Sequence, residues 1–256
     1  MNYIRLTEEN LDREHICCAI SGEKDPQVVS KKEWLKERIK EGLVFLKADV
    51  RGKCFIEYMP AEYAWVPIEA DGYMHINCFW VSGSCKGHGH ADELLGQCIA
   101  DAKEKGKCGI TVISSPKKKP FLMDPEYLSY KGFQTADEAA PYFTLMYLPF
   151  TRAAGAPKFK DCAKRAQNDM AGFSLYYTSG CPYTAKYVPI LEKCAEKLQV
   201  QFTALKLDSR ERAQNAPSAW TNFALFYNGR YITHEILSEK KFLGLIEEIK
   251  GAEKRR

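Results

Sequence analysis

The most informative stretch of this chain is Ser84-Cys85-Lys86-Gly87-His88-Gly89-His90-Ala91. It follows an apolar segment at residues 76–81 and precedes a run with the periodicity of an amphipathic helix. Two glycines spaced Gly-x-Gly let the backbone turn tightly and approach a ligand closely. The first N–H groups of the following helix have no partner within it and point into the turn. A strand, a glycine turn and a helix N-terminus together predict an anion site, usually for phosphate.

The helix after this turn is predicted from apolar residues at spacings of 3, 4, 7, 8 and 11. These residues are Ala91, Leu94, Leu95, Cys98, Ile99 and Ala102. The turn lacks the Lys-Ser/Thr ending of a P-loop, and Asp92 stands where the dinucleotide fingerprint has its third glycine. The sequence therefore favours a phosphate-bearing ligand but matches neither nucleotide motif.

The order of elements around the turn resembles the GNAT family of acyl-CoA-dependent N-acetyltransferases. A strand ending at Val81 leads through the turn into a long helix, a strand over 110–113, a second helix and a final strand near 143–148. The family signature Gln/Arg-x-x-Gly-x-Gly/Ala reads here Ser84-x-x-Gly87-x-Gly89. Lys131-Gly132-Phe133 matches the Gly-Phe that ends the last helix of the family. The resemblance covers residues 1–148.

This resemblance implies acetyl-CoA as cosubstrate and names the residues that would bind it. The backbone of Phe79, Trp80 and Val81 would hold the pantetheine arm, and the Val81 N–H would lie near the acetyl oxygen as an oxyanion-hole donor. The same three residues can equally be interpreted as the core of a strand. The two interpretations are compatible, because the backbone would bind the arm. The pyrophosphate would bind the amides of Lys86, Gly87, His88, Gly89, His90 and Ala91.

The general acid in many family members is a tyrosine a few residues before Gly-Phe. The usual position falls on Leu128, and Tyr127 and Tyr130 flank it as the catalytic candidates, with a core or rim role as the alternative for each. A water chain to Glu57 or His75 could serve as the base. The competing interpretations are a solvent-facing glutamate in a strand and a histidine that is hydrogen-bonded in the core.

Length and composition predict a two-domain α/β protein. By the resemblance, residues 1–150 would form a GNAT domain with a mixed sheet flanked by helices, and we expect residues 151–172 to form a linker and a helix. In the first domain we expect strands at 3–6, 43–48, 53–59, 64–68 and 74–81, and helices near 8–20 and 33–41. A further helix is expected at 161–171.

Charge and cysteine usage limit the partners. The net charge of +4 is small for 256 residues, and the basic residues are spread along the chain, which argues against nucleic acid. No apolar run reaches the length of a membrane span, and the first residues are not typical of a signal peptide, so we expect a cytoplasmic protein. Ten cysteines without a Cys-x-x-Cys pair predict reduced thiols and no metal.

Residues 173–256 have a second pattern with the order β-α-β…β-β-α. Cys181-Pro182-Tyr183-Thr184 at its first strand-helix junction resembles the thioredoxin-like fold. Thr184 replaces the resolving cysteine, and Thr221 stands where that family has its cis-proline. A GNAT half followed by such a domain resembles the YoaP-like acetyltransferases, as do residues 60–65, 78–81 and 140–143.

Two functions follow from these patterns. The first is an acetyl-CoA-dependent N-acetyltransferase in which an amine, on a small molecule or a protein, attacks directly in a ternary complex. The alternative is a thiol protein in which Cys181 carries the activity and the first half only binds or senses acetyl-CoA. For Cys181, the helix N-terminus predicts a lowered thiol pKa. The competing interpretation, which Thr184 and Thr221 favour, is a degenerate domain that binds a ligand or only stabilises the enzyme. A pure CoA-binding module is a third option. The acceptor and the oligomeric state, a homodimer included, are left open.

Overall fold

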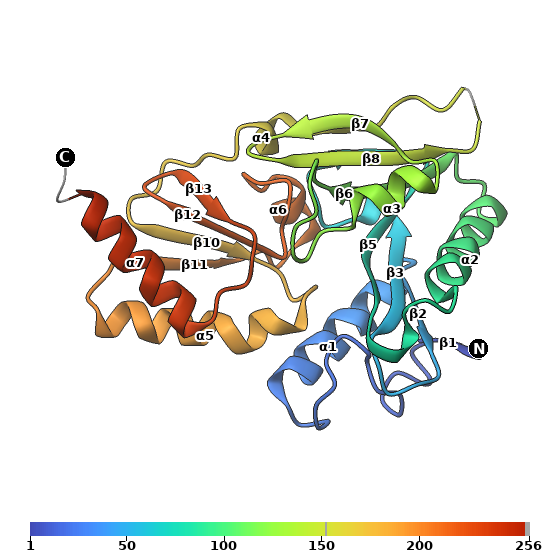
Figure 1. The fold of residues 1–256 in the computed structure, drawn as a ribbon, viewed down its shortest axis with the longest axis horizontal. Helices are drawn as coiled ribbons and strands as arrows, with labels where there is room; N and C mark the ends of the chain where they lie inside the picture. The colour runs from blue at the N-terminus through green and yellow to red at the C-terminus, as the bar shows by residue number, and fades with distance from the viewer. Residues whose placement is uncertain (152, 254–256) are drawn as a thin grey trace.

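The computed structural model describes residues 1–151 and 153–253. Figure 1 shows a larger group of elements beside a smaller one formed by the C-terminal part of the chain. The elements of the larger group are β1 (Tyr3–Arg5), α1 (Pro26–Lys40), β2 (Val44–Ala48), β3 (Cys54–Pro60), η1 (Ala61–Tyr63), β4 (Ile68–Glu69), β5 (Tyr73–Val81), η2 (Gly83–Cys85), α2 (His90–Glu104), β6 (Gly109–Ser114), α3 (Pro125–Tyr130), β7 (Gln134–Ala139), β8 (Phe143–Pro149), β9 (Lys158–Phe159) and α4 (Asp161–Lys164).

The smaller group begins after α4. Its elements are β10 (Phe173–Tyr177), α5 (Pro182–Lys197), β11 (Phe202–Lys206), α6 (Arg210–Gln214), β12 (Phe223–Tyr227), β13 (Arg230–Thr233) and α7 (Glu239–Glu253). In the described part of the chain, the strands form a seven-stranded sheet in the order β1-β2-β3-β5-β6-β8-β7, a four-stranded sheet in the order β11-β10-β12-β13, and the pair β4-β9. The expected mixed α/β fold, with a helix-flanked mixed sheet, is confirmed.

The large sheet divides at β5. This strand is antiparallel to β3 along its whole length, but its parallel register with β6 covers only Tyr73–Ile76. From there β6 continues beside β8 while β5 runs on to Val81. A register shift opposite Glu57 and Tyr58 leaves Asn77 as an extra residue in β5, and such a bulge bends a strand away from its neighbour. The two central strands therefore separate in their second halves.

Helix α2 covers the face of the sheet next to this separation (Figure 1). Its buried side chains Leu94, Leu95, Cys98 and Ala102 are those that the periodicity predicts, and they pack into a core with the strands. The helix begins after Gly89 and ends before Gly106, both of which have positive φ. Such φ values favour glycine, because a Cβ would clash with the backbone there.

In the C-terminal sheet, β10 is central, parallel to β11 and antiparallel to β12, and β13 follows β12 through a hairpin. Asn228 and Gly229 both have positive φ, as their hairpin signal predicts. The elements have the predicted order, while the thioredoxin-like assignment stays a prediction. The boundaries at 150 and 172 also stay predictions, and Arg152 of the linker and residues 254–256 lie outside the described residues.

The two groups are joined through a shared hydrophobic cluster. Trp34 and Trp65 of the first group pack in it with Leu207 and Ala219 of the second, and Trp220 packs against it. Helix α1 also packs against α5. The N- and C-terminal parts of the chain are therefore packed against each other through a common hydrophobic core.

Three expectations about local structure are wrong. Residues 8–18 form turns rather than a helix, because Asn10 bonds the backbone of Arg5 and of Thr7 and so stabilises a turn. Of residues 64–68, only Ile68 enters a strand, which pairs with β9 outside the large sheet. The helix expected at 161–171 ends at Lys164, and Ala166 has a positive φ. Among the described helices, none combines the length and apolar character needed to cross a bilayer.

Candidate active site

The predicted anion site is an open turn. Gly83, Gly87 and Gly89 have φ values of 61°, 79° and 77°. Among the described residues, nothing lies within 4 Å of a Cβ placed on Gly87 or Gly89. Gly89 is the N-cap of α2 and offers no side-chain oxygen to the first N–H groups of the helix. These N–H groups therefore face open space, and the exposed Lys86 lies next to them.

Two acidic residues follow the turn, and each has side-chain partners. Asp92 pairs with Lys131 at 2.7 Å and accepts a hydrogen bond from the Tyr127 hydroxyl at 3.1 Å. Glu93 accepts a hydrogen bond from the Tyr3 hydroxyl. The bonds from Lys131 and from Tyr3 lower the pKa of Asp92 and Glu93 respectively. Lys131 offsets the charge of Asp92, whereas Glu93, held by Tyr3 and His90, keeps its negative charge at the start of the helix.

The two histidines of the turn differ in position. His90 is buried, and its Nδ1 lies 3.1 Å from the Tyr3 hydroxyl, whereas His88 is exposed. Their rings lie 6.1 Å apart. Across the described residues, no group of three or more His, Cys, Asp or Glu side chains has an arrangement that could hold a metal ion.

The second half of β5 presents backbone groups at the separation from β6. The Ser82 N–H donates to the Lys53 carbonyl of the neighbouring strand at 2.8 Å. Because successive N–H groups of a strand point to opposite edges, the N–H groups of Val81 and Phe79 face the other edge, toward β6. The side chain of Trp80 lies under the Lys53 ammonium, 3.9 Å from the ring centroid.

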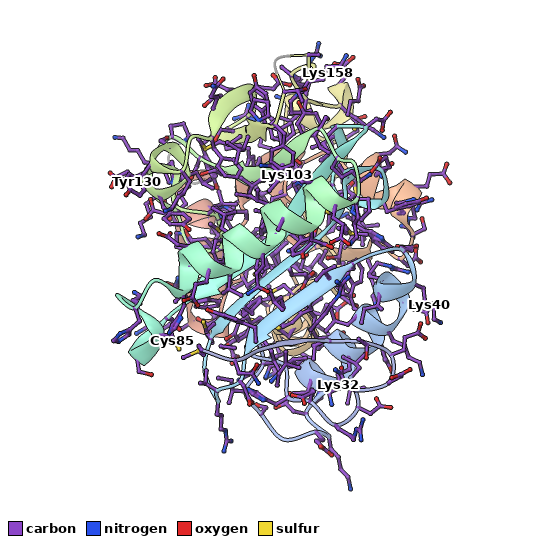
Figure 2. The ribbon with its side chains drawn as sticks, turned by 90° about the vertical axis from the view of Figure 1, so that its right-hand side faces the viewer. Lys32, Lys40, Cys85, Lys103, Tyr130 and Lys158 are labelled. Carbon is purple, nitrogen blue, oxygen red and sulfur yellow. The ribbon has the colours of Figure 1, made fainter. Side chains whose placement is uncertain are left out.

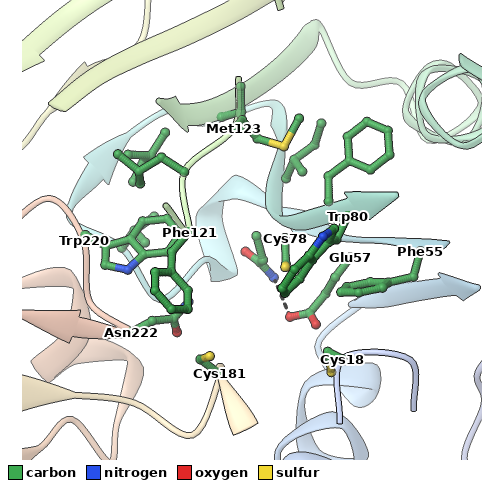
Figure 3. Close-up of a pocket in the computed structure, with 18 of the residues that line it drawn as sticks. Cys18, Phe55, Glu57, Cys78, Trp80, Phe121, Met123, Cys181, Trp220 and Asn222 are labelled. Carbon is green, nitrogen blue, oxygen red and sulfur yellow. Dashed lines mark hydrogen bonds between the residues drawn. The ribbon is translucent and has the colours of Figure 1, made fainter. Parts of the chain in front are cut away.

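A cavity of about 580 Å³ opens beside this edge. Its lining includes Phe79, Trp80 and Val81 from the predicted arm-binding strand and Lys86 and Ala91 from the turn. The structure thus brings most of the predicted cofactor residues to one cavity. Gly87, His88, Gly89 and His90 lie in the turn but do not line it. The opposite wall comes from the C-terminal group, and Figure 3 shows Cys181, Trp220 and Asn222 across from Glu57 and Trp80.

Glu57 does not face solvent, contrary to one of the two interpretations above. It is buried on β3, and its side chain points into the cavity (Figure 3). One carboxylate oxygen accepts a hydrogen bond from the Lys31 ammonium at 2.6 Å, and the other lies 3.5 Å from the Asn77 amide nitrogen. The same ammonium donates to the Gly180 carbonyl at 2.6 Å. Lys31 therefore connects the carboxylate to the turn that carries Cys181.

Lys31 was missed by the sequence reasoning. Its side chain is 1% exposed, and it lies on the same face of α1 as the buried Trp34 and Leu35. Burial lowers the pKa of its ammonium, but the Glu57 carboxylate more than offsets this, and the pKa lies above its ordinary value. The sequence could have indicated Lys31, because this lysine stands at a helix position where the periodicity predicts an apolar residue.

The two candidate tyrosines lie in different environments. Tyr127 lines the cavity, and its ring lies edge-on to Phe79 with centroids 6.1 Å apart. Burial and the neighbouring Asp92 raise the pKa of the Tyr127 hydroxyl, which keeps it protonated. Tyr130 is 81% exposed and is not brought to the cavity; Figure 2 shows its side chain at the surface. His75 is buried, bonds Thr111 at 3.0 Å, and has its pKa lowered to about 3 by burial.

Cys181 contradicts the expected thiolate. It is the N-cap of α5, and burial raises the pKa of its thiol to about 11, although the Tyr183 N–H and Lys31 act in the opposite direction. Thr184, which replaces the resolving cysteine, donates its hydroxyl to the Thr178 and Cys181 carbonyls at 2.9 and 2.7 Å. At neutral pH the Cys181 thiol is protonated. Every cysteine among the described residues is free of a disulfide.

A helix-flanked mixed sheet whose central strands separate beside a glycine turn and an uncapped helix N-terminus is the arrangement expected from the resemblance to the GNAT acyltransferases. Over 250 residues the chain is 46% identical to the protein named "Uncharacterized N-acetyltransferase YoaP" of Bacillus subtilis (strain 168), covering 97% of this chain and 100% of that protein. A family described as YoaP-like matches residues 201–243. The chain therefore belongs to the YoaP-like N-acetyltransferases, as its motifs predicted.

Solved structures of the same class are more distant. The PaiA N-acetyltransferase of Thermoplasma acidophilum in complex with coenzyme A is 16% identical, with a TM-score of 0.41, covering 59% of this chain and 100% of that chain. A GNAT family acetyltransferase of Brucella melitensis in complex with acetyl-CoA is 15% identical, with a TM-score of 0.38, covering 62% of this chain and 96% of that chain.

Proposed function

We propose that this enzyme transfers an acetyl group from acetyl-CoA directly to an amine within a ternary complex. The observation that carries the proposal is the separation of β5 from β6 beside the open turn of α2. One end of the cavity offers unpartnered helix N–H groups and Lys86 for a pyrophosphate. From there, the edge of β5 with the N–H groups of Phe79 and Val81 leads toward Glu57 and suits an extended amide-containing arm.

The chemistry follows from the groups at the inner end of this path. The amine nitrogen attacks the thioester carbonyl, and the Val81 N–H stabilises the developing oxyanion. The C–N bond forms, and one proton passes from nitrogen to the Glu57 carboxylate. As the C–S bond breaks, the leaving sulfur takes a proton from the Tyr127 hydroxyl, which regains one from solvent, and Glu57 releases to solvent the proton that it accepted. The products are the N-acetylated amine and coenzyme A.

Cys181 has no covalent part in this reaction. Its raised pKa leaves little thiolate at neutral pH, and a protonated thiol is a poor nucleophile. The thiol-protein alternative therefore has less support than direct transfer. We assign Tyr127 rather than Tyr130 to the acid role because Tyr127 lines the cavity.

The proposal is tested by calorimetric titration of acetyl-CoA into the wild-type protein and the Gly89→Trp variant. Gly89 has a φ of 77° and open space above it, so an indole would occupy the predicted phosphate position. We expect the dissociation constant to rise at least ~100-fold, about 2.7 kcal/mol. Gly96→Trp is the matched control, because Gly96 lies on the exposed face of the same helix with nothing within 4 Å.

Each result has a clear meaning. Binding that is lost in Gly89→Trp and kept in Gly96→Trp supports the cofactor site and justifies a search for the amine. Acetyl-CoA binding of equal strength in both variants would place the cofactor elsewhere. No binding to folded wild-type protein would overturn the proposed function.

A further inference from the structure

The inner end of the cavity is closed by the C-terminal group. Thr178, Gly180 and Cys181 come from the turn between β10 and α5, and Trp220 and Asn222 come from the segment before β12. Figure 3 shows Cys181, Trp220 and Asn222 on the side of the cavity that faces Glu57. An acceptor amine that reaches the thioester along this side lies between both groups of elements.

This wall is fixed to the first group by short hydrogen bonds. Thr221 donates its hydroxyl to the Trp65 carbonyl at 2.6 Å, and the Lys31 ammonium holds the Gly180 carbonyl at the same distance. His234 Nε2 lies 2.7 Å from the Pro120 carbonyl. The cavity, of about 580 Å³ and shared with the cofactor arm, has a volume in the range of small-molecule sites, which favours a small acceptor.

The lining is rich in aromatic side chains. Trp80 and Phe121 are 36% and 40% exposed, although both are large apolar residues, and Figure 3 shows Phe121 beside Trp220 and Trp80 across the cavity from them. Open aromatic surface of this kind is typical of a site for an apolar ligand. The complete set of aromatic lining residues, tyrosine and histidine aside, is Trp34, Phe55, Trp65, Phe79, Trp80, Phe121 and Trp220.

Each carboxylate among the described residues that line the cavity is paired with an ammonium group. The two carboxylates of this lining among the described residues are Glu57 and Asp124, and each already has an ammonium partner, Lys31 or Lys118, at 2.6 Å. Lys86 adds a further positive charge. A polyamine or an aminoglycoside brings several ammonium groups, and each needs a carboxylate to offset its desolvation in such a site. A monoamine, by contrast, has a single nitrogen that attacks in its neutral form, and it needs only one group to accept its proton.

We infer that the acceptor is a small monoamine with an aromatic or branched apolar body. Its nitrogen lies beside Glu57, and its body packs on Trp80, Phe121 and Trp220. This inference rests on the proposed acetyl transfer and adds the substrate class. The C-terminal group then acts as the wall that selects the acceptor.

The test compares four amines with the full chain and acetyl-CoA, measuring coenzyme A release. The amines are 2-phenylethylamine, 3-methylbutylamine, spermidine and a lysine peptide with a blocked N-terminus. We expect kcat/KM for each monoamine to exceed that for spermidine and the peptide at least ~10-fold. A preference for spermidine or the peptide would overturn the inference, as would acetyl-CoA binding without acetylation of either monoamine. Absence of acetyl-CoA binding in the calorimetric titration would instead overturn the proposed function beneath it.

A pair of variants tests the assigned wall. Trp220→Ala is expected to raise the KM for 2-phenylethylamine about tenfold and to leave the dissociation constant of acetyl-CoA unchanged. Tyr63→Ala is the control, because Tyr63 is an exposed aromatic residue that contacts Arg210 at the junction of the two groups outside the cavity. If Trp220→Ala unfolds, Trp220→Leu keeps an apolar side chain and is expected to raise the same KM. An unchanged KM in the folded variant would contradict the assignment.

Discussion

Two strand-to-helix turns border the cavity, one before α2 and one before α5. Each leads into a long helix whose N-cap, Gly89 or Cys181, makes no side-chain capping bond among the described residues. Judged by the backbone alone, both are candidate anion sites, because both end in unpaired N–H groups. Their surroundings make them different sites.

The α2 turn is open, and the α5 turn is filled. Above the glycines of the α2 turn lies empty space, whereas a Cβ on Gly180 would lie 2.5 Å from the Asn222 amide oxygen. Pro182 removes one N–H at the first position of α5, and the Thr184 hydroxyl bonds two carbonyls of the turn. The same local pattern thus yields a ligand site where the surroundings are empty and a structural support where the other half packs against it.

The largest effect is expected for Lys31→Met, which removes the ammonium group that bonds both Glu57 and the Gly180 carbonyl of the filled turn. The variant leaves a buried carboxylate without its counterion, and we expect the free energy of unfolding to fall by about 3–5 kcal/mol. Chemical denaturation measures it. Adding Glu57→Gln should recover much of the loss, because the uncompensated charge is then gone.

The matched control for that variant is Lys53→Met. Lys53 also joins the two groups, through the Tyr183 hydroxyl at 2.9 Å, but it is only partly buried. We expect a loss of about 1 kcal/mol or less. Equal losses in Lys31→Met and Lys53→Met would mean that the buried pair has no special importance for the filled turn.

Tyr127→Phe tests the chemistry beside the open turn. Without its hydroxyl, the leaving thiolate has no positioned donor, and we expect kcat to fall on the order of 100-fold with the KM for acetyl-CoA unchanged. Steady-state kinetics with a monoamine acceptor measures both constants. Tyr130→Phe, three residues along and 81% exposed, should keep wild-type kcat. A larger loss in Tyr130→Phe than in Tyr127→Phe would reverse the assignment.

The reactivity of Cys181 tests the filled turn. Its pKa of about 11, against 9.0 for an unperturbed thiol, predicts about 100-fold less thiolate at neutral pH in the folded chain than in the unfolded chain. Alkylation at Cys181, followed by peptide mass spectrometry, should be slower by that factor and should accelerate as the pH rises toward 11. Because the folded state resists ionisation, this group also makes the fold less stable as the pH rises from about 9 to about 11. Rapid alkylation at pH 7 would support an open, thiolate-bearing turn.

The features that could be predicted from sequence belong to the open α2 turn, and those that could not belong to the surroundings of the filled α5 turn. The α2 turn was found because glycine spacing and helix periodicity are local, and both survive folding. The role of Lys31 and the burial of Glu57 depend on how α1 packs against β3 and on the position of Gly180, 149 residues away along the chain. The raised pKa of Cys181 was missed for a related reason: a helix N-terminus lowers a thiol pKa, but burial outweighs that effect here.

The smallest effect is expected for Cys181→Ser. Serine is close to cysteine in size and is a favoured N-cap residue, so the turn should remain filled. Since the proposed reaction uses Glu57 and Tyr127 and forms no bond to sulfur, kcat for a monoamine should stay within about threefold of wild type. The KM for the amine is free to shift, because the thiol lines the cavity. Complete loss of acetyl transfer in a folded variant would give Cys181 a covalent role and make the filled turn, rather than the open one, the centre of the chemistry.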